Sequence, residues 1–278
     1  MVKKEKNSDK YIPELEEKII DLSLKLKSKS NELNASIETN SKILGKLTHN
    51  LKNPVGVIFS FSEMMLEDLE DYSTEKLAKH LQIIKNSATF SLAFLDTISK
   101  YTRLNSPNFS LKTERINYSE LVNNLINLLR AKAAEKNIDL DVCFPSNDIF
   151  LTLDKDEITQ ALSAVLNNAL RYSNENSTVN ISVEETKNTV ETAITDQGIG
   201  ISETDLPNIF EEFYVVNTYS ADKQKCIGLG LAIAKKIVAL HNGKISVKST
   251  LEKGASFKII LPSTMDIIHK INASTVKI

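Results

Sequence analysis

The sequence predicts an α+β protein in which a long helical hairpin precedes a mixed β-sheet covered by helices. About the first hundred residues are almost free of glycine, proline and β-branched runs, and their apolar residues recur at helical spacing. From about Leu111 short β-like runs alternate with helical patterns. Between the two parts, L-N-S-P-N around Pro107 predicts a linker, because Asn, Ser and Pro favour turns and the helical period stops there.

The composition narrows the possible functions. A chain of 278 residues, of which 41% are hydrophobic, can form an ordinary domain with a packed core and a substantial helical extension. The formal net charge of -2 gives no basic surface of the kind that binds nucleic acid. The Lys-rich N-terminus fits a solvated tail better than a membrane anchor. We therefore expect no nucleic-acid partner.

Two further features bear on the location of the protein. No apolar run approaches the roughly 20 residues that cross a bilayer, and charged residues stand where a signal peptide would have an apolar segment. Cys143 and Cys226 are far apart and belong to no Cys-x-x-Cys motif, so we expect neither a disulfide nor a zinc site. These features predict a cytoplasmic protein without a membrane span in this chain.

The N-terminal helix carries a heptad pattern. Pro13 suits the first turn of this helix. The two seam positions of the heptad are occupied by Ile19, Leu26, Leu33, Asn40 and Leu47 and by Leu15, Leu22 and Ile43. We expect residues 1–40 to form a parallel dimeric coiled coil. Lys29 and Ser36 interrupt the seam, so an ordinary amphipathic helix remains the alternative.

A helical hairpin follows the heptad segment. The first helix continues to about Glu70, D-Y-S-T interrupts it, and Ser73 or Thr74 can cap a second helix that runs to about Arg103. Each helix carries an apolar stripe, formed by Leu44, Leu47, Leu51, Val55, Ile58 and Met65 on one and by Leu77, Leu81, Ile84, Phe94, Leu95 and Ile98 on the other. Two helices alone cannot bury both stripes, so we predict a four-helix bundle built from two chains, and hence a homodimer.

The second part of the chain is expected to alternate helices and strands. The expected elements are, in order, a helix from Ser119 to about Lys136 capped by Ser119, strands at 138–144 and 149–153, a helix capped by Asp154, strands at 179–186 and 189–195, a helix after Gly228, and strands at 244–250 and 256–261. A mixed sheet covered by helices accommodates this order.

The segment D-Q-G-I-G suggests a ligand-binding turn. Gly198 and Gly200 let the backbone turn sharply and approach a ligand, while the carboxylate of Asp196 can accept a hydrogen bond from an exocyclic amine such as that of adenine. A tight turn after a strand needs the same glycines for purely structural reasons, so this segment by itself leaves both interpretations open.

A second glycine-rich segment, G-L-G-L-A-I-A-K-K, begins at Gly228. Gly228, Leu229 and Gly230 come just before a predicted helix, where free backbone N–H groups and the positive end of the helix dipole suit phosphate groups. Such glycines are also common for structural reasons. The two glycine-rich segments together with Asn168 are typical of an ATP pocket.

Polar residues near the end of the preceding helix complete this candidate pocket. The side-chain oxygen of Asn168 is a hard ligand suited to Mg²⁺, and Arg171 lies where it could reach a phosphate. Asn168 could instead be satisfied by nearby backbone. A stretch with Phe210, Phe213 and Tyr214, followed by the polar run N-T-Y-S-A-D-K-Q-K, is long enough to be a mobile lid, although the aromatic residues could equally be ordinary core contacts.

Five segments in this order resemble the motifs of two-component sensor histidine kinases over roughly residues 40–262. They are T-H-N-L-K-N-P, which resembles the H box, L-N-N-A-L-R-Y-S the N box, D-Q-G-I-G-I the G1 box, I-F-E-E-F-Y the F box and G-L-G-L-A-I the G2 box. H-N-G-K-I-S-V-K-S and F-K-I-I-L-P are similar to the closing strands of the same domain. Each box alone is a modest match, but five in this order are specific.

The resemblance implies a dimerisation and phosphoacceptor hairpin followed by a Bergerat-type ATP-binding α/β sandwich. It implies that His49 accepts the γ-phosphate of ATP, that Asn168 coordinates Mg²⁺ and that Asp196 contacts the adenine amine. Arg171 and Tyr172 match positions that contact phosphate and nucleotide. The glycines at 198, 200, 228 and 230 would shape the pocket. The phosphoryl group would then pass to an aspartate of a response-regulator receiver domain.

The same resemblance sets the expected domains. They are a signalling helix at 1–40, the dimerisation and phosphoacceptor domain at 41–104, a linker at 105–110, the catalytic ATP-binding domain at 111–262 and a tail at 263–278. A neutral imidazole such as that of His49 is a competent nucleophile near neutral pH.

Several residues depart from the family pattern. Asn50 stands where the residue after the acceptor histidine is usually acidic, so autophosphorylation is expected to be slow. Asn53, four residues after His49 on the same helical face, matches a position that can orient water for dephosphorylation of the partner. Further departures are Ala164, Cys226, Ile227, Glu252 and Ala255, which put the nucleotide affinity in doubt.

Three other functions remain open at this point. The departures allow a non-catalytic or phosphatase-biased dimeric scaffold that binds nucleotide. A Bergerat-fold ATPase of the chaperone or mismatch-repair kind would hydrolyse ATP without labelling itself, and a serine kinase of the anti-sigma type would form an acid-stable phosphoprotein. The last two would not need the hairpin that carries His49.

Overall fold

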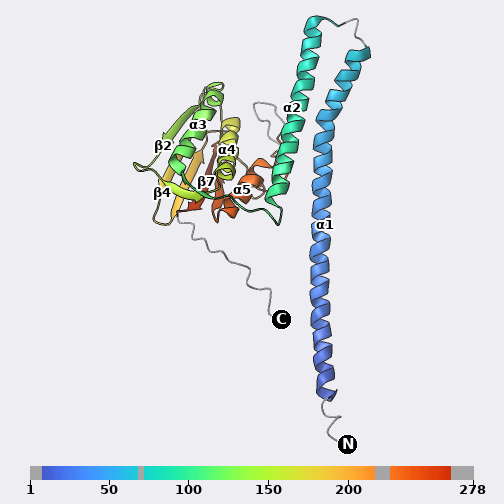
Figure 1. Ribbon diagram of the computed structural model, residues 1–278. Coiled ribbons are helices and arrows are strands. Elements are labelled where there is room, and N and C mark those ends of the chain that lie inside the picture. Colours follow the sequence, from blue (N-terminus) through green and yellow to red (C-terminus); the bar gives the residue numbers. More distant parts are fainter. Residues whose placement is uncertain (1–7, 68–71, 217–225, 264–278) are drawn as a thin grey trace, which may run out of the picture. The chain divides into compact units, whose positions relative to one another are not determined.

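A computed structural model describes residues 8–67, 72–216 and 226–263. The chain divides into two compact units, Met1–Ser91 and Leu92–Ile278, and Figure 1 labels several of their elements. The division falls inside the second helix, so the last turns of that helix belong to the unit that contains the β-sheet. The domain boundaries expected from the sequence remain predictions.

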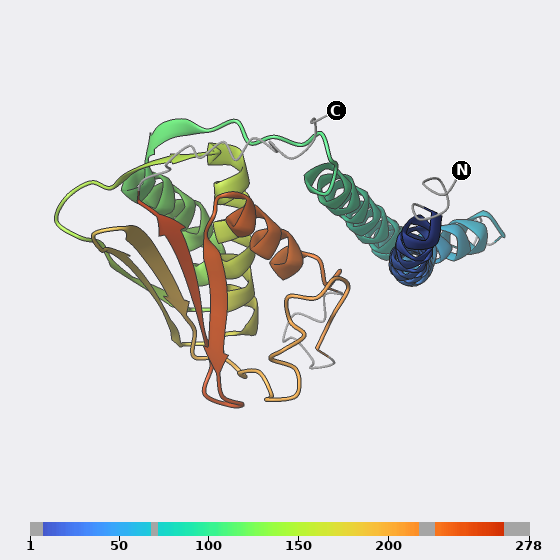
Figure 2. The ribbon, with the colours of Figure 1, turned by 90° about the horizontal axis from the view of Figure 1, so that it is seen from below.

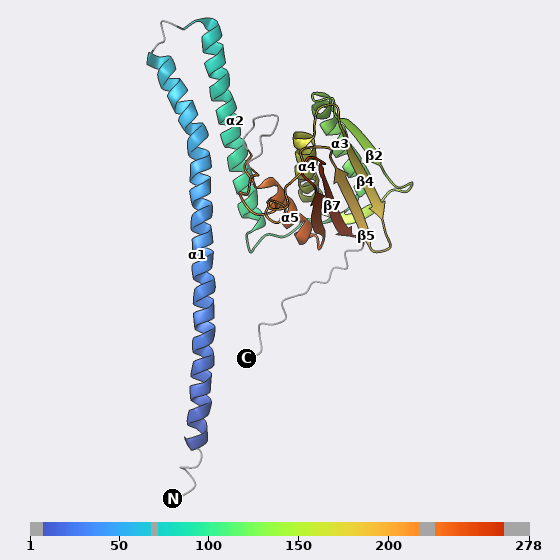
Figure 3. The ribbon, with the colours of Figure 1, turned by 180° about the vertical axis from the view of Figure 1, so that it is seen from behind.

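The first unit is built on the predicted hairpin. Helix α1 (Ser8–Glu67) and the first part of α2 (Thr74–Leu104) run in opposite directions (Figures 1 and 3). Ser73 caps α2, because its hydroxyl accepts a hydrogen bond of 3.2 Å from a first-turn N–H. Near the turn, the ring of Phe61 packs edge-on against that of His80, with 4.9 Å between centroids. Residues 68–71 of the expected break lie outside the described residues.

The second unit contains a five-stranded mixed sheet in the order β2-β4-β5-β7-β6. Its strands are β2 (Asp139–Cys143), β4 (Thr178–Glu185), β5 (Thr189–Thr195), β6 (Lys244–Ser249) and β7 (Ala255–Pro262). β2 pairs with β4 in parallel, and the other pairs are antiparallel. Helices α3 (Tyr118–Ala134), α4 (Lys155–Tyr172) and α5 (Gly230–Leu240) cover one face of this sheet (Figure 2).

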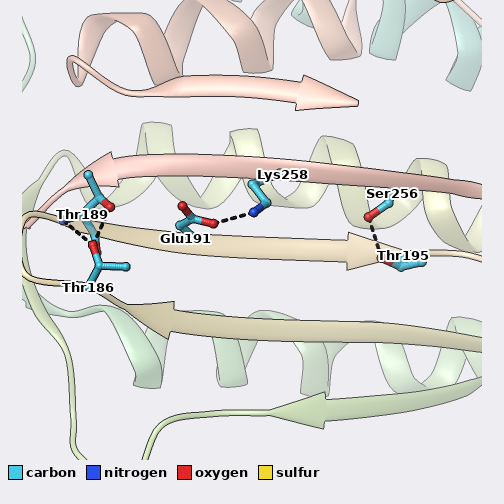
Figure 4. Close-up of polar contacts among 6 residues, drawn as sticks. All are labelled: Thr186, Thr189, Glu191, Thr195, Ser256 and Lys258. Carbon is cyan, nitrogen blue, oxygen red and sulfur yellow. Dashed lines mark hydrogen bonds and ion pairs between the residues drawn. The ribbon is translucent and has the colours of Figure 1, made fainter. Parts of the chain in front are cut away.

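The two faces of the sheet differ in chemistry. Side chains along β5 alternate, so that Val190, Thr192 and Ile194 are buried under the helices. The opposite face carries polar pairs between β5 and β7, namely Lys258 Nζ to Glu191 Oε2 at 2.6 Å and Thr195 to Ser256 at 2.8 Å, with Thr186 and Thr189 bonded at the adjoining turn (Figure 4). One covered face and one solvated face confirm the α+β class.

Two details of the second unit differ from the sequence prediction. A short strand, β1 (Glu114–Asn117), pairs antiparallel with β3 (Phe150–Leu153) in a separate two-stranded sheet, and β1 was not expected. Ser119 is not the cap of α3: the cap is Asn117, whose side chain accepts from the backbone N–H of Glu120 at 3.0 Å. The Ser119 hydroxyl instead accepts from the N–H of Ile149, a contact distant in sequence that the local pattern does not contain.

The cap expected for α4 is confirmed. Asp154 is buried, and its Oδ1 accepts from the N–H of Glu157 at 3.3 Å while its Oδ2 accepts from the N–H of Lys112 at 2.7 Å. One carboxylate therefore begins α4 and fixes the segment that leads into β1. The helix that it starts carries Asn168, Arg171 and Tyr172 toward its C-terminal end.

Candidate nucleotide-binding site

Asp196 follows the last residue of β5 and is buried. Its Oδ1 accepts two backbone hydrogen bonds, from Gly198 at 2.9 Å and from Ala255 at 3.1 Å. Burial raises the pKa of the carboxyl group, and the two backbone N–H groups partly offset that rise. Within the described part of the chain, Oδ2 makes no hydrogen bond, so the carboxylate is held by one oxygen and can accept with the other.

The turn after Asp196 has no space for side chains at its glycines. A Cβ at Gly198 would lie 2.1 Å from the carbonyl oxygen of Tyr172. Gly200 has φ +68°, and a Cβ there would lie 2.1 Å from the carbonyl oxygen of Thr250. The G1 segment is thus enclosed between the end of α4 and the turn that joins β6 to β7.

One constituent of this site was missed by the sequence reasoning. Gly254 has φ +79°, and a Cβ there would lie 2.0 Å from the carbonyl oxygen of Asp196. The next residue, Ala255, donates its N–H to the Asp196 carboxylate and accepts from the Asp196 N–H at 2.9 Å. The available signal was a glycine immediately before the last strand, in a segment where Glu252 and Ala255 depart from the family pattern.

The polar residues at the end of α4 have different environments. Asn168 is half-buried, and its side chain makes no hydrogen bond among the described residues, so its amide oxygen is not committed to nearby backbone. Arg171 donates from Nη1 to the Sγ atom of Cys226 at 2.8 Å, and the hydroxyl of Tyr172 lies 3.4 Å from the same sulfur. Burial, and then the contact with Cys226, raise the pKa of Tyr172. Cys226 therefore contacts two of the residues that are predicted to bind the nucleotide.

The second glycine segment meets the F box directly. The N–H of Phe213 donates to the carbonyl oxygen of Gly228 at 2.8 Å, and Gly228 has φ +75°, with a Cβ position 2.7 Å from the carbonyl oxygen of Tyr214. Leu229 is fully buried, and Gly230 begins α5 without a side-chain cap. A helix start of this kind leaves backbone N–H groups for an anion.

Two further expectations concern this region. Gly230 has only the Cβ of Ala164 near the position of an added Cβ, at 4.0 Å, so no close contact requires a glycine there. Residues 217–225 of the expected lid lie outside the described residues.

The other predicted site residues belong to the first unit. His49 and Asn53 are exposed on α1, one helical turn apart, and Asn50 is half-exposed beside them. Pro54 lies inside the same helix and is buried. The predicted nucleotide residues from Asn168 to Gly230 thus lie in the second unit. His49, Asn50 and Asn53 belong to the unit that ends at Ser91.

Two further observations apply to the described residues. Within residues 8–67, 72–216 and 226–263, no three His, Cys, Asp or Glu side chains group in a way that could hold a metal ion. In the same ranges no helix has the combination of length and hydropathy needed for a membrane span.

Comparison with known proteins identifies the second unit. Residues 153–265 match the family described as histidine kinase-, DNA gyrase B-, and HSP90-like ATPase. The chain is 30% identical over 225 residues, 81% of its length, to the sensor protein KdpD of Clostridium acetobutylicum, and 26% identical over 223 residues to the sensor histidine kinase WalK of Bacillus subtilis. It spans 25% of that KdpD and 36% of that WalK.

A solved structure resembles the chain over both units. The histidine kinase ThkA, in complex with the response regulator protein TrrA, aligns with a TM-score of 0.65 and 27% identity over 83% of this chain and 64% of ThkA. The resemblance to two-component sensor histidine kinases and the presence of an ATP-binding domain of that type are therefore confirmed.

Proposed function

We propose that this chain, as a sensor histidine kinase, transfers the γ-phosphoryl group of ATP to His49 and then to an aspartate of a response-regulator receiver domain. The main support is that one chain holds both an ATPase domain of the histidine kinase type and a solvent-exposed histidine in an H-box segment. The carboxylate of Asp196, anchored through Oδ1 with Oδ2 available, is suited to the adenine amine.

Each pocket residue has a role that fits its surroundings. Arg171 would reach a phosphate oxygen by leaving the sulfur of Cys226, because phosphate oxygens are strong charge-assisted acceptors for a guanidinium group. Tyr172 would contact the nucleotide from the same helix end. The turn formed by Gly228, Leu229 and Gly230 would hold the phosphates at the start of α5.

Mg²⁺ fits one residue of this pocket. The amide oxygen of Asn168 is a hard ligand that no described residue engages, and phosphate oxygens and water would complete the coordination. The ion would neutralise charge on the phosphates.

In the transfer itself a neutral imidazole nitrogen of His49 attacks the γ-phosphorus, the bond to the β-phosphate oxygen breaks, ADP leaves and the imidazole gives up its proton.

Asn50 is proposed to slow this step. A carboxylate beside the acceptor could orient the imidazole and stabilise the departing proton, whereas the amide of Asn50 can only form hydrogen bonds. We expect Asn50→Asp to raise the initial rate of autophosphorylation, measured with labelled ATP under single-turnover conditions. A rate equal to or below that of the wild type would remove this role from Asn50.

Asn53 is proposed to support dephosphorylation of the receiver. It is exposed one turn from His49, where its amide could position water for attack on an aspartyl phosphate. The wild type should shorten the lifetime of a phosphorylated receiver, and Asn53→Ala should do so much less. Equal shortening by both proteins would show that Asn53 is an ordinary polar residue of the bundle.

The partners and location follow from the same proposal. The apolar side chains exposed along α1 and α2 support a homodimer in which a coiled coil and a four-helix bundle cover them. A receiver domain would dock beside His49, as the complex of ThkA with TrrA suggests. We also propose that the chain works in the cytoplasm, where ATP and receiver domains are found.

One competing function has support of its own. Cys226 engages Arg171 and Tyr172, and Asn50 lacks the usual charge, so a phosphatase-biased or non-catalytic scaffold that binds nucleotide is the second candidate. It predicts nucleotide binding without label on His49. A gyrase- or chaperone-like ATPase would hydrolyse ATP without labelling itself, and a serine kinase would carry acid-stable label.

A labelling experiment separates these functions. The purified chain and a His49→Ala variant are incubated with γ-labelled ATP and Mg²⁺, and the labelled protein is treated with acid. Acid-labile label that is absent from the variant is the expected result. Label that persists in His49→Ala, or that survives acid, would overturn the proposal, and binding without label would favour the scaffold.

A further inference from the structure

The last turns of α2 reach the F box through one tyrosine. Tyr101 is half-buried, and its hydroxyl donates a hydrogen bond to Oε1 of Glu212. Its ring lies edge-on to that of Phe213, with 6.4 Å between centroids and 65° between planes. Burial and the neighbouring carboxylate raise the pKa of Tyr101, so the hydroxyl remains a donor at neutral pH.

Phe213 has an unusual backbone conformation. Its φ of +58° lies in the left-handed region, which is rare for an aromatic residue and is strained unless neighbouring contacts hold it. Its side chain is buried, and its N–H donates to the carbonyl oxygen of Gly228 at 2.8 Å. The ring of Tyr101 is in edge-on contact with the ring of this residue.

The backbone at Gly228 is closely packed against the backbone of Phe213 and Tyr214. A Cβ there would lie 2.7 Å from the carbonyl oxygen of Tyr214 and 2.8 Å from the carbonyl carbon of Phe213. The segments around 213 and 228 are therefore packed backbone against backbone, and a shift of Phe213 must move Gly228. Gly228 is the first residue of the turn that precedes the uncapped N-terminus of α5.

We propose that Tyr101 is a positioning residue for the nucleotide site, which acts through Phe213 to hold Gly228 and the phosphate-binding turn in place. The inference rests on the proposed binding of ATP at that turn. It gives helix α2, which carries no pocket residue, a direct influence on nucleotide affinity. By reciprocity, nucleotide bound at Gly228 would stabilise the contact between Tyr101 and the F box.

A purely structural role for Tyr101 makes a different prediction. Arg103, half a turn further along α2, forms an ion pair with the buried Glu157 at the start of α4. That pair also anchors the end of α2, but Glu157 lies near the opposite end of α4 from Arg171. If both residues only anchored the helix, their variants would lower the melting temperature and leave the affinity of the folded protein for nucleotide unchanged.

The test measures the Kd of ATP with Mg²⁺ by isothermal titration calorimetry on the full chain, well below each variant's melting temperature. We expect Tyr101→Ala to raise the Kd by about tenfold and Tyr101→Phe, which keeps the ring, by less than about threefold. Thr102→Ala, an exposed neighbour, and Arg103→Gln should bind as the wild type does, although Arg103→Gln should melt at a lower temperature.

Other outcomes would overturn the inference. Tyr101→Ala that binds with the wild-type Kd, or Arg103→Gln that weakens binding equally, would show that α2 is only anchored. Tyr101→Leu, which retains apolar volume without the aromatic edge, replaces Tyr101→Ala if the latter does not fold, with the same expected direction. A wild type that binds no nucleotide would instead remove the proposed function on which the inference depends.

Discussion

The two compact units differ in how far their apolar side chains are buried. In the second unit Leu153 and Leu162 are 0% exposed and Ile194 is 1% exposed, so sheet and helices close a core of their own. On α1, Leu26 is 73% exposed and Leu44 is 62% exposed. Burial of apolar surface is the main driving force of association. The comparison shows an ATP-binding unit with a closed apolar core and a hairpin with exposed apolar side chains, which supports the proposed homodimer.

Glycines show the same contrast. Gly45 and Gly56 on α1 have no atom within 4 Å of an added Cβ, whereas Gly198, Gly200 and Gly254 have backbone atoms at 2.0–2.1 Å. In the hairpin a glycine is a weak helix residue that a side chain could replace. At the pocket a glycine is required because another strand or helix end occupies the space. Replacing a glycine should therefore lower the stability of the second unit but not that of the hairpin.

Gly198→Ala should be the most damaging of these changes. Its Cβ would overlap the carbonyl oxygen of Tyr172, so the end of α4 or the G1 turn must move. We expect the unfolding free energy of the second unit to fall by roughly 2–4 kcal/mol, with loss of nucleotide binding. Differential scanning calorimetry checks this. Gly45→Ala is the matched control and should stabilise the hairpin by about 0.5–1 kcal/mol; destabilisation by Gly45→Ala would show that a partner helix occupies that face.

Asp196→Asn should weaken nucleotide binding without unfolding the unit. The amide oxygen can keep the bonds from Gly198 and Ala255, but an NH₂ group would then face the adenine amine. We expect the Kd for ATP to rise by about 100-fold, equivalent to about 2.7 kcal/mol. Calorimetric titration measures the Kd, and an unchanged value would remove Asp196 from the adenine contact.

The same variant tests the effect of burial on Asp196. Because burial raises the native pKa of this carboxyl group, the native state binds its proton more readily than the unfolded chain does. The contribution of Asp196 to stability is thus fully present below the unfolded pKa and is lost as the pH rises through the native pKa. Asp196→Asn should reduce this loss in a series of melting curves, and an identical pH dependence would contradict the assignment.

Replacement of Leu26 and Leu33 together by Lys should dissociate the proposed hairpin dimer and leave the nucleotide domain intact. Both leucines are exposed on α1 and occupy the same position of the heptad. We expect the dimer Kd to rise by at least about tenfold, or 1.4 kcal/mol, in light scattering coupled to gel filtration. Leu128→Lys, which changes an exposed leucine of α3, is the control and should leave the mass unchanged. Equal masses for all three proteins would argue against the coiled coil.

Cys226→Ala should have the smallest effect. It removes one acceptor from Arg171, and sulfur is a weaker acceptor for a guanidinium group than the oxygens of phosphate are. We expect the Kd for ATP to fall by no more than about threefold. Cys143→Ala, on β2, is the control. A clear loss of affinity in Cys226→Ala would mean that the sulfur holds Arg171 in its binding position instead of competing for it.

Much of the fold and the pocket could be predicted because its signals are local. Helical and strand periods, the caps at Ser73 and Asp154, and the order of the boxes are all encoded over a few residues. The chemistry expected for Asp196 also needed only its residue type and the glycines that follow it. The roles of His49, Asn168 and the other named site residues remain predictions that the experiments above would decide.

The tertiary structure decided what depends on residues far apart in the chain. Ala255 bonds to a carboxylate 59 positions away, Arg171 meets Cys226 across 55 positions, and Tyr101 meets Glu212 across 111. Residue type, spacing and local propensity determined that this chain would form a helical hairpin and an ATP-binding α+β unit. Which backbone groups hold Asp196, and which side chains contact the F box, depended on packing, because such contacts are fixed only when distant segments come together.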